Sequence, residues 1–313
     1  MTQSLGIVFP GQGAQYVGMG ADFLQSSEEV RQLFSEASNI LGYDAGRLCL
    51  DGPQNVLDQT VNTQVTVFLV NCACFEVFRK ASSLTPRVMA GHSLGEFSAL
   101  RAAGSLSFAD AVRLVRSRAQ YMKDAVPAGS GCMAAIIGIS RDAVELLCRR
   151  SDPTLGMVAP ANFNAPGQTV ISGERPAVES VMEAARDAGA KAVKLPISVP
   201  CHSRLLDGAT VKLAFLLEKL SVGETSVPVI PNFDPTTSHS VSKTRRLLAS
   251  QLNAPVRWQE TVERMISMGV TLFVELGPKK TLSNLIKRIR PDIPVVNVED
   301  RASLEGALAT IEG

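Results

Sequence analysis

The residue pattern with the clearest chemistry is a serine between two glycines, Gly91-His92-Ser93-Leu94-Gly95. A short apolar run at 88–90 precedes it and an amphipathic run begins at Gly95, which predicts a sharp turn between a strand and a helix. Glycines at both ends of such a turn avoid clashes between backbone segments, so the serine hydroxyl projects outwards. We therefore predict that Ser93 is a nucleophile.

A nucleophile at this position needs donors for the negative charge that develops on its substrate. The N–H of Leu94 opens the predicted helix and faces such a charge. A second donor is expected from the loop 10–15 after the apolar strand 5–9, where two glycines let the backbone approach a ligand and Gln12 offers both a main-chain N–H and a side-chain amide. This loop lacks the glycine spacing of a phosphate-binding loop, so nucleotide binding is not predicted.

The serine also needs a base, and the chain has three histidines. His92 leaves the turn in a different direction from Ser93, so we expect it to pack beneath the turn. His239 lies in a polar segment, 236–240, that we interpret as a surface loop. His202 follows an apolar segment fixed by Pro200, which we interpret as a strand. By elimination we predict that His202 is the base.

Composition limits the classes of function. The 313 residues include 31 basic and 30 acidic side chains, which gives no overall attraction to nucleic acid or to a membrane. Six cysteines form no Cys-x-x-Cys pair and histidines are few, so we predict no metal site and reduced, buried thiols. Without a leader pattern or a long uninterrupted apolar segment, we expect a cytoplasmic protein with no membrane contact.

The order of the predicted elements indicates an α/β protein with two units. Strands and helices alternate over most of the chain, which is typical of a mainly parallel sheet covered on both faces. Between 131 and 195 the order is strand-helix-strand-strand-helix-strand, the ferredoxin-like order. We predict a large domain at 1–128 and 198–313 and a small ferredoxin-like subdomain inserted at 129–197.

Seven motifs, in order along the chain, resemble those of the malonyl-CoA:acyl carrier protein transacylases. They are FPGQGAQ at 9–15, GHSLGE at 91–96, Arg118 within RSRAQYM, NFNAPGQ at 162–168, SVPCHS at 198–203, QLNAPVRW at 251–258 and VELGPKKTLSNLIKRI at 274–289. The resemblance extends from residue 5 to about 300. It implies an α/β-hydrolase-like core that carries the ferredoxin-like subdomain.

The resemblance also implies a role for each matching residue. Ser93 looks like the acyl-accepting nucleophile and His202 like its base, with the main-chain carbonyl in the Gln251 region orienting the imidazole. Leu94 and Gln12 resemble the oxyanion donors. Arg118 resembles the residue that binds the free carboxylate of the malonyl group; from the residues alone, one arginine of its helix can face a cleft while the others face water.

The implied reaction moves malonyl from malonyl-CoA to the phosphopantetheine thiol of an acyl carrier protein, without a metal or a permanently bound cofactor. We expect a monomer with a basic patch for an acidic carrier protein, formed by Lys279, Lys280, Lys287, Arg288 and Arg290. A serine thioesterase or hydrolase, or a non-catalytic carrier-protein docking subunit, is the alternative. Cys201 and Phe97 depart from the family pattern, where serine and tyrosine are usual, and we expect a preference for malonyl over methylmalonyl.

Overall fold

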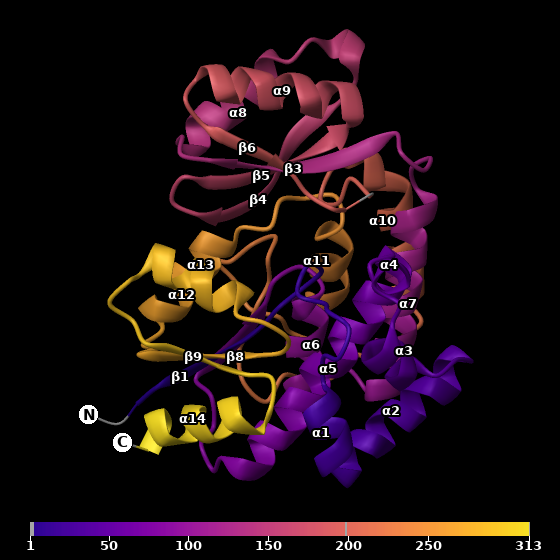
Figure 1. Cartoon of the computed structure of the whole chain (residues 1–313), viewed down its shortest axis with the longest axis vertical. Coiled ribbons are helices and arrows are strands. Elements are labelled where there is room, and N and C mark those ends of the chain that lie inside the picture. Colours follow the sequence, from indigo (N-terminus) through magenta and orange to yellow (C-terminus); the bar gives the residue numbers. More distant parts are fainter. Residues whose placement is uncertain (1–2, 198, 313) are drawn as a thin grey trace.

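The larger of two sheets is parallel throughout. The computed structural model describes residues 3–197 and 199–312. Sheet A has the strand order β7-β2-β1-β8-β9. Its strands are β1 (Leu5–Phe9), β2 (Val88–Gly91), β7 (Val229–Ile230), β8 (Leu272–Leu276) and β9 (Val295–Val298). Figure 1 shows this sheet in the lower part of the molecule, with both chain ends near its outer side. The predicted mainly parallel sheet is confirmed.

Helices cover both faces of sheet A because alternate residues of each strand are apolar on opposite sides. Ile7 and Phe9 of β1 pack into a core with α2 (Glu28–Leu41), α5 (Thr60–Ala81), α6 (Gly95–Ala102) and α7 (Phe108–Asp124). Val8 between them packs into a second core with α12 (Trp258–Ser267) and α13 (Thr281–Ile289). Strand β1 is therefore buried on both sides, and its carboxyl end is left to carry chemistry.

Helix α5 is long and apolar enough to cross a membrane, but it lies in the protein core. Of its most apolar window, 78% is buried inside the structure. It packs against α2, α6 and α7, which explains why its apolar side chains run around the whole helix instead of along one stripe.

Sheet B is antiparallel, with the order β4-β5-β3-β6. Its elements are β3 (Gly131–Ile137), α8 (Arg141–Arg150), η1 (Pro153–Leu155), β4 (Val158–Ala165), β5 (Gln168–Glu174), α9 (Arg175–Asp187) and β6 (Lys191–Lys194). Both helices cover the outer face, above the strands in Figure 1. The inner face, with Met133 and Ala135, joins the main core. This is the ferredoxin-like arrangement, whereas the exact domain boundaries stay a prediction, and residue 198 lies outside the described residues.

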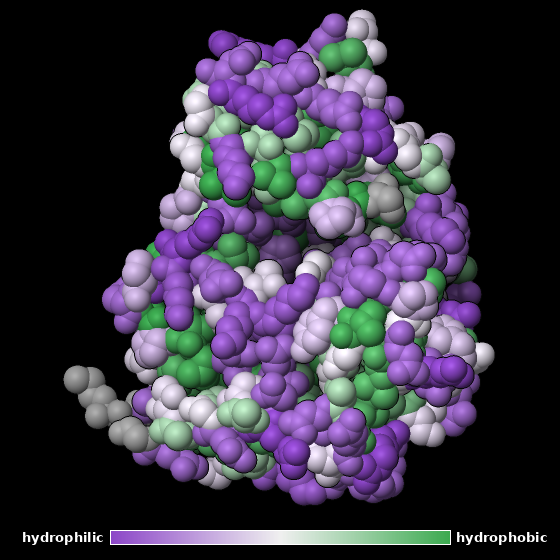
Figure 2. Space-filling view, in the orientation of Figure 1, coloured by the Kyte–Doolittle hydropathy of each residue, from purple (hydrophilic) through white to green (hydrophobic). Residues whose placement is uncertain are grey.

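The remaining helices surround these sheets. They are α1 (Ala21–Ser26), α3 (Ala45–Asp51), α4 (Gln54–Leu57), η2 (Arg204–Leu206), α10 (Asp207–Leu217), α11 (Thr244–Ser250) and α14 (Arg301–Glu312). The strand predicted just before His202 is wrong: Val199 to Cys201 form no strand and continue into a turn. Ser198, which belongs to the same predicted segment, lies outside the described residues. Figure 2 shows that the surface is hollowed between sheet B above and the larger part below.

The turn after β2 depends on close backbone approach. A Cβ at Gly95 would lie 2.0 Å from the carbonyl oxygen of Phe9, and one at Gly91 would lie 1.9 Å from the carbonyl carbon of Gly95. Both conflicts involve backbone atoms, which cannot rotate away as side chains do. The glycines therefore let α6 start directly against β1, and this contact fixes the position of residue 93.

We expect Gly95→Ala to lower the free energy of unfolding by about 3 kcal/mol or more, because β1 and α6 must separate. Gly208→Ala is the matched control: Gly208 is in α10 and a Cβ there meets nothing within 4 Å. This control should be neutral or raise the free energy of unfolding by up to about 1 kcal/mol. Urea denaturation measures both variants. A Gly95→Ala variant as stable as the parent chain would contradict the packing argument.

Candidate active site

Ser93 lies in the turn between β2 and α6, with a left-handed backbone (φ 52°) that a non-glycine residue adopts only under constraint. Two side chains provide the constraint. The Ser93 N–H donates to Oδ1 of Asn232 at 2.6 Å, and Nε2 of Gln251 donates to the Ser93 carbonyl at 2.9 Å. Both groups of the Ser93 backbone are thereby held, and its hydroxyl points into a cavity.

His202 contacts the serine directly. Its Nε2 lies 2.8 Å from Oγ of Ser93, and its Nδ1 lies 2.8 Å from the carbonyl oxygen of Gln251. Since a carbonyl only accepts, Nδ1 carries the hydrogen and Nε2 presents its lone pair to the hydroxyl. This is the tautomer that a general base needs, and the orienting group is a neutral carbonyl instead of a carboxylate.

Burial governs the basicity of His202. Burial first and the nearby positive charge of Arg118 second lower the pKa of this imidazole, the bond to the Gln251 carbonyl opposes the change, and the pKa is about 3. The imidazole is therefore neutral at any pH well above 3 and ready to accept a proton. The charged form, which appears once the proton has been taken, needs compensation from a negative group in the cavity.

The lowered pKa of His202 predicts an unusual pH dependence. Neutral imidazole is the active form, so acid inactivates the base only as the pH approaches 3. We expect the acylation of Ser93 by a neutral ester to be constant between pH 7.5 and about 5. An acid limb near pH 6.5 would contradict this. Circular dichroism at each pH is the control, because unfolded chains bind the proton from about pH 6.5 downwards and stability falls in that range.

Arg118 of α7 is a buried charge without an acidic partner. Only 1% of the residue is exposed, and among the described residues no carboxylate forms a salt bridge with it. Its Nη2 donates to Oγ of Ser93 at 3.0 Å and to Oε1 of Gln251 at 3.1 Å, and its Nη1 donates to Oε1 of Gln64 at 2.5 Å. Its Nε–H has no acceptor in the part of the chain that the structure describes.

The guanidinium stays charged in this position. Burial lowers the pKa of Arg118 to about 10, which leaves the group protonated at neutral pH. The ring of Phe97 lies 5.4 Å from its Cζ and covers one face. A buried cation with an unpaired N–H is costly unless an anion enters, so the site fits a carboxylate ligand.

Two further N–H groups face the same turn. Of the predicted donors, Leu94 is the N-cap residue of α6 and Gln12 lies in the loop after β1, and neither N–H has an acceptor among the described residues. A Cβ built on Gly11 would lie 2.4 Å from the His92 carbonyl oxygen and 3.6 Å from the Leu94 nitrogen, so the two segments are close. The Gln12 side chain is engaged elsewhere, with Thr60. Its main-chain N–H is therefore the group available to a ligand.

The cavity beside these groups has a volume of about 50 Å³, enough for a few heavy atoms. It lies between the strands of sheet B and the loops that follow β1 and β2 of sheet A. Its lining consists of Gln12, Gln64, His92, Ser93, Arg118, Met122, Met133, Asn162, Ile197, Cys201 and His202. Four predicted site residues are thus in the lining, and Leu94 and Gln251 lie directly behind it.

The other two histidines differ from expectation. The His92 ring also lines the cavity instead of packing wholly beneath the turn; its Nε2 lies 2.9 Å from Oδ1 of Asn164 and the ring packs edge-on against Trp258. His239 was predicted to lie in a surface loop and is instead buried, with 4% exposed. Its polar neighbours in sequence indicated a loop correctly but not the direction of its side chain.

Several residues of the site have no signal in the sequence. Gln64 lies in the apolar run of α5, and Asn232 is joined to the site only by contacts between distant segments. Among the described residues no cluster of metal-ligating side chains occurs, and all six cysteines are free and buried. Burial raises the pKa of the Cys201 thiol to about 11, so this cysteine stays protonated.

The parallel sheet, the strained serine and the contacting histidine define a serine acyltransferase site. The chain belongs to the acyl transferase domain family, which it matches over residues 7–301. This confirms the resemblance seen in the sequence.

Relatives of known name show which enzymes of this family the chain is similar to. The malonyl CoA-acyl carrier protein transacylase of Haemophilus influenzae is 42% identical over 299 residues, which cover 95% of this chain and 96% of the relative. The enzyme of the same name from Bacillus subtilis strain 168 is 39% identical and covers 98% and 97%. Both alignments span nearly the whole of each protein, so this chain is similar to complete enzymes.

Solved structures agree with these relatives. The malonyl CoA-acyl carrier protein transacylase of Coxiella burnetii superposes with a TM-score of 0.96 at 40% identity, covering 100% of this chain and 99% of that one. A malonyl-transacylase solved in complex with its type II PKS acyl-carrier protein gives a TM-score of 0.95 at 42% identity, covering 98% and 100%. The predicted fold class is thereby confirmed.

Proposed function

We propose that this protein transfers malonyl from malonyl-CoA to the thiol of an acyl carrier protein through a malonyl ester on Ser93. The observation that carries the proposal is the buried, unpaired guanidinium of Arg118 beside the serine. A malonyl thioester ends in a carboxylate and is short, so its anionic end can reach this guanidinium while its carbonyl lies over the hydroxyl. The names of the relatives support the same substrate.

In the first half of the reaction, Ser93 Oγ attacks the thioester carbonyl carbon while its proton moves to Nε2 of His202. The carbonyl oxygen becomes negative and accepts hydrogen bonds from the N–H groups of Leu94 and Gln12. The carbon–sulfur bond then breaks and His202 returns the proton to the sulfur of coenzyme A. Malonyl remains on the serine as an ester.

The second half repeats the cycle with another thiol. The phosphopantetheine thiol of the carrier protein gives its proton to His202 and attacks the ester carbonyl. The carbon–oxygen bond breaks, and the proton returns to Ser93 Oγ. The imidazole of His202 accepts and returns the proton in each half of the reaction, so these steps need no cofactor.

The substrate carboxylate also explains the charge balance of the site. In the free protein, Arg118 donates to Ser93 Oγ and leaves its Nε–H unpaired. A carboxylate that binds Nε–H and Nη2 of Arg118 pairs this donor. It also brings a negative charge near His202, whose own hydrogen-bond partner, the Gln251 carbonyl, is neutral. Acetyl lacks the carboxylate and leaves the guanidinium unpaired, which favours malonyl.

A serine hydrolase is supported less well. Such enzymes commonly orient the histidine with a carboxylate and have no need of a cation facing the acyl group. Here the third group is a carbonyl and the cavity contains Arg118. A docking subunit without activity would have no reason to keep the contact between Ser93 and His202 at 2.8 Å.

The direct test is intact mass spectrometry of the protein incubated with malonyl-CoA, methylmalonyl-CoA or acetyl-CoA, followed by addition of a carrier protein. We expect a malonyl adduct on Ser93, its absence from Ser93→Ala, and its transfer to holo carrier protein. Hydrolysis to free malonate without transfer would support the hydrolase instead. An adduct only with acetyl-CoA would refute the role of Arg118.

We also propose that an acidic carrier protein docks on the exposed basic side chains of α13 and the residues before it. Lys280, Lys287 and Arg288 are exposed, and Arg288 donates to Gln168 of sheet B at 2.6 Å, so the patch borders the hollow between the two sheets. Two predicted members are engaged elsewhere. Lys279 binds the carbonyl oxygens of Gly13 and Gln15, and Arg290 pairs with Asp292.

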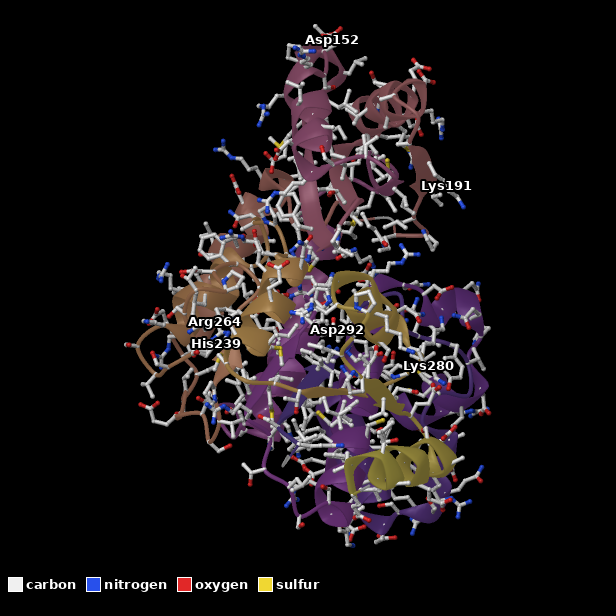
Figure 3. All side chains as sticks on the ribbon, turned by 90° about the vertical axis from the view of Figure 1, so that its left-hand side faces the viewer. Asp152, Lys191, His239, Arg264, Lys280 and Asp292 are labelled. Atoms are coloured by element: carbon white, nitrogen blue, oxygen red, sulfur yellow. The ribbon has the colours of Figure 1, made fainter. Side chains whose placement is uncertain are left out.

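We expect Lys280→Glu with Lys287→Glu to raise the KM for the carrier protein about tenfold at low salt and less at high salt, because charge attraction assists encounter. Lys191→Glu is the control, since Lys191 lies on sheet B, away from Lys280 (Figure 3). Malonyl-Ser93 formation should change much less than transfer. An unchanged KM for the carrier protein would contradict this patch. A monomeric state and a cytoplasmic location stay predictions.

A further inference from the structure

A buried acidic residue and a buried histidine lie behind the site and do not touch the cavity. Oε1 of Glu96 is 2.8 Å from Nε2 of His239, and both side chains are completely buried. Glu96 is in the first turn of α6, and His239 lies between β7 and α11. Buried ionisable side chains are expensive, so a pair in this position needs a reason.

Glu96 connects two side chains that hold the reactive groups. Its Oε2 accepts from the N–H of Asn232 at 2.9 Å and from Nε2 of Gln251 at 2.7 Å. Asn232 in turn holds the Ser93 N–H with Oδ1 and donates from Nδ2 to the carbonyl of Gly91 at 2.7 Å. One carboxylate thus supports both sides of the serine turn.

The hydrogen bond between Glu96 and Gln251 fixes the orientation of the Gln251 amide. Its Nε2 donates both to Glu96 and to the Ser93 carbonyl, so both amide hydrogens are used. Its oxygen is then the only group left for Arg118, whose Nη2 donates to it at 3.1 Å. If Glu96 moved, the amide could rotate and present hydrogens to the guanidinium, which would push the guanidinium away.

His239 holds Glu96 in place. A carboxylate oxygen only accepts, so Nε2 of His239 carries the hydrogen and donates to Oε1 of Glu96, while Nδ1 accepts from the Thr244 hydroxyl at 3.1 Å. The ring is thereby fixed with Nε2 towards Glu96. Among the described residues, His239 is the one partner of Oε1, so its loss leaves a buried carboxylate oxygen unpaired.

We propose that Glu96 and His239 are positioning residues for malonyl transfer, acting on Arg118 through Gln251 and on Ser93 through Asn232. The proposal rests on the proposed function, since it concerns how Arg118 is set for a carboxylate substrate. Loss of either residue should therefore affect malonyl transfer more than acylation by acetyl-CoA, because only the malonyl group uses Arg118.

The test compares His239→Leu with His239→Gln, whose amide nitrogen takes the place of Nε2. We expect His239→Leu to lower the ratio of kcat/KM for malonyl-CoA to that for acetyl-CoA about tenfold, through KM for malonyl-CoA, because a small displacement of the guanidinium weakens carboxylate binding. His239→Gln should restore the ratio to within about threefold. Ser242→Ala, in the same loop and exposed, is the control.

A purely structural role predicts a different result: both substrates would lose activity equally, along with Tm, and this would overturn the proposal. If His239→Leu does not fold, Thr244→Val tests the same ring at equal volume, with an expected ratio about threefold lower. An unchanged ratio in this folded variant would also overturn it. If the parent chain transfers acetyl but not malonyl, the proposed function fails first and takes this inference with it.

Discussion

Arg118→Ala is expected to lower kcat/KM for malonyl transfer about a thousandfold, because the substrate carboxylate loses a buried, charged partner. Acetylation of Ser93 from acetyl-CoA should fall much less, since acetyl makes no use of the guanidinium. The measurement is the rate of adduct formation from each thioester by rapid quench and mass spectrometry. The selectivity between the two thioesters should therefore change sharply.

The controls for this prediction separate charge from geometry. Arg118→Lys keeps the charge but presents it as a point, so we expect only partial activity. Arg113→Ala, in the same helix with a side chain that is 58% exposed, should behave as the parent chain. Equal losses for malonyl-CoA and acetyl-CoA in Arg118→Ala would mean that Arg118 supports the fold and does not bind the carboxylate.

His202→Ala should slow acylation of Ser93 about 10²- to 10⁴-fold, the usual contribution of a general base. Within the part of the chain that the structure describes, the variant loses the one group within hydrogen-bond distance of the Ser93 hydroxyl that accepts a proton, since Arg118 can only donate. Burst kinetics with malonyl-CoA give the rate.

Added imidazole provides a specific check of this role. The side chain removed in His202→Ala lines the cavity, so a small base can enter the space and restore part of the rate. The restored rate should rise with pH near 7, the pKa of free imidazole in water, and not near 3. A variant that keeps more than about a tenth of the parent rate without imidazole would rule out general-base catalysis by His202.

The sequence predicts those features of the site that depend on local backbone geometry. Gly91 and Gly95 around Ser93 indicate a turn because no other residue permits that backbone contact, and the structure has the turn there. The mainly parallel sheet follows from the alternation of strands and helices. The proposed pairing of Ser93 with His202 needed elimination among three histidines, and its geometry agrees although the strand expected before His202 is absent.

Contacts between distant segments could not be predicted in this way. His239 has Ser238 and Ser240 as neighbours, and a polar neighbourhood is typical of the surface; its burial depends on Glu96, 143 positions away. Gln64 lies in an apolar helix, where a single amide gives no indication that it binds Arg118. Polar residues satisfied by remote partners leave no periodic pattern, so only the fold reveals them.

The cavity lies between sheet B and the loops and helices around sheet A, so the position of the reacting groups and the size of the cavity depend on different parts of the chain. Ser93, Arg118 and Gln251 are held by elements around sheet A, whereas Met133 and Asn162 close the space from sheet B. Changes in the strands of sheet B therefore alter the size of acyl group admitted while the reacting atoms keep their places. Substitutions in sheet B can therefore change which acyl group is preferred, while the catalytic residues around sheet A stay the same.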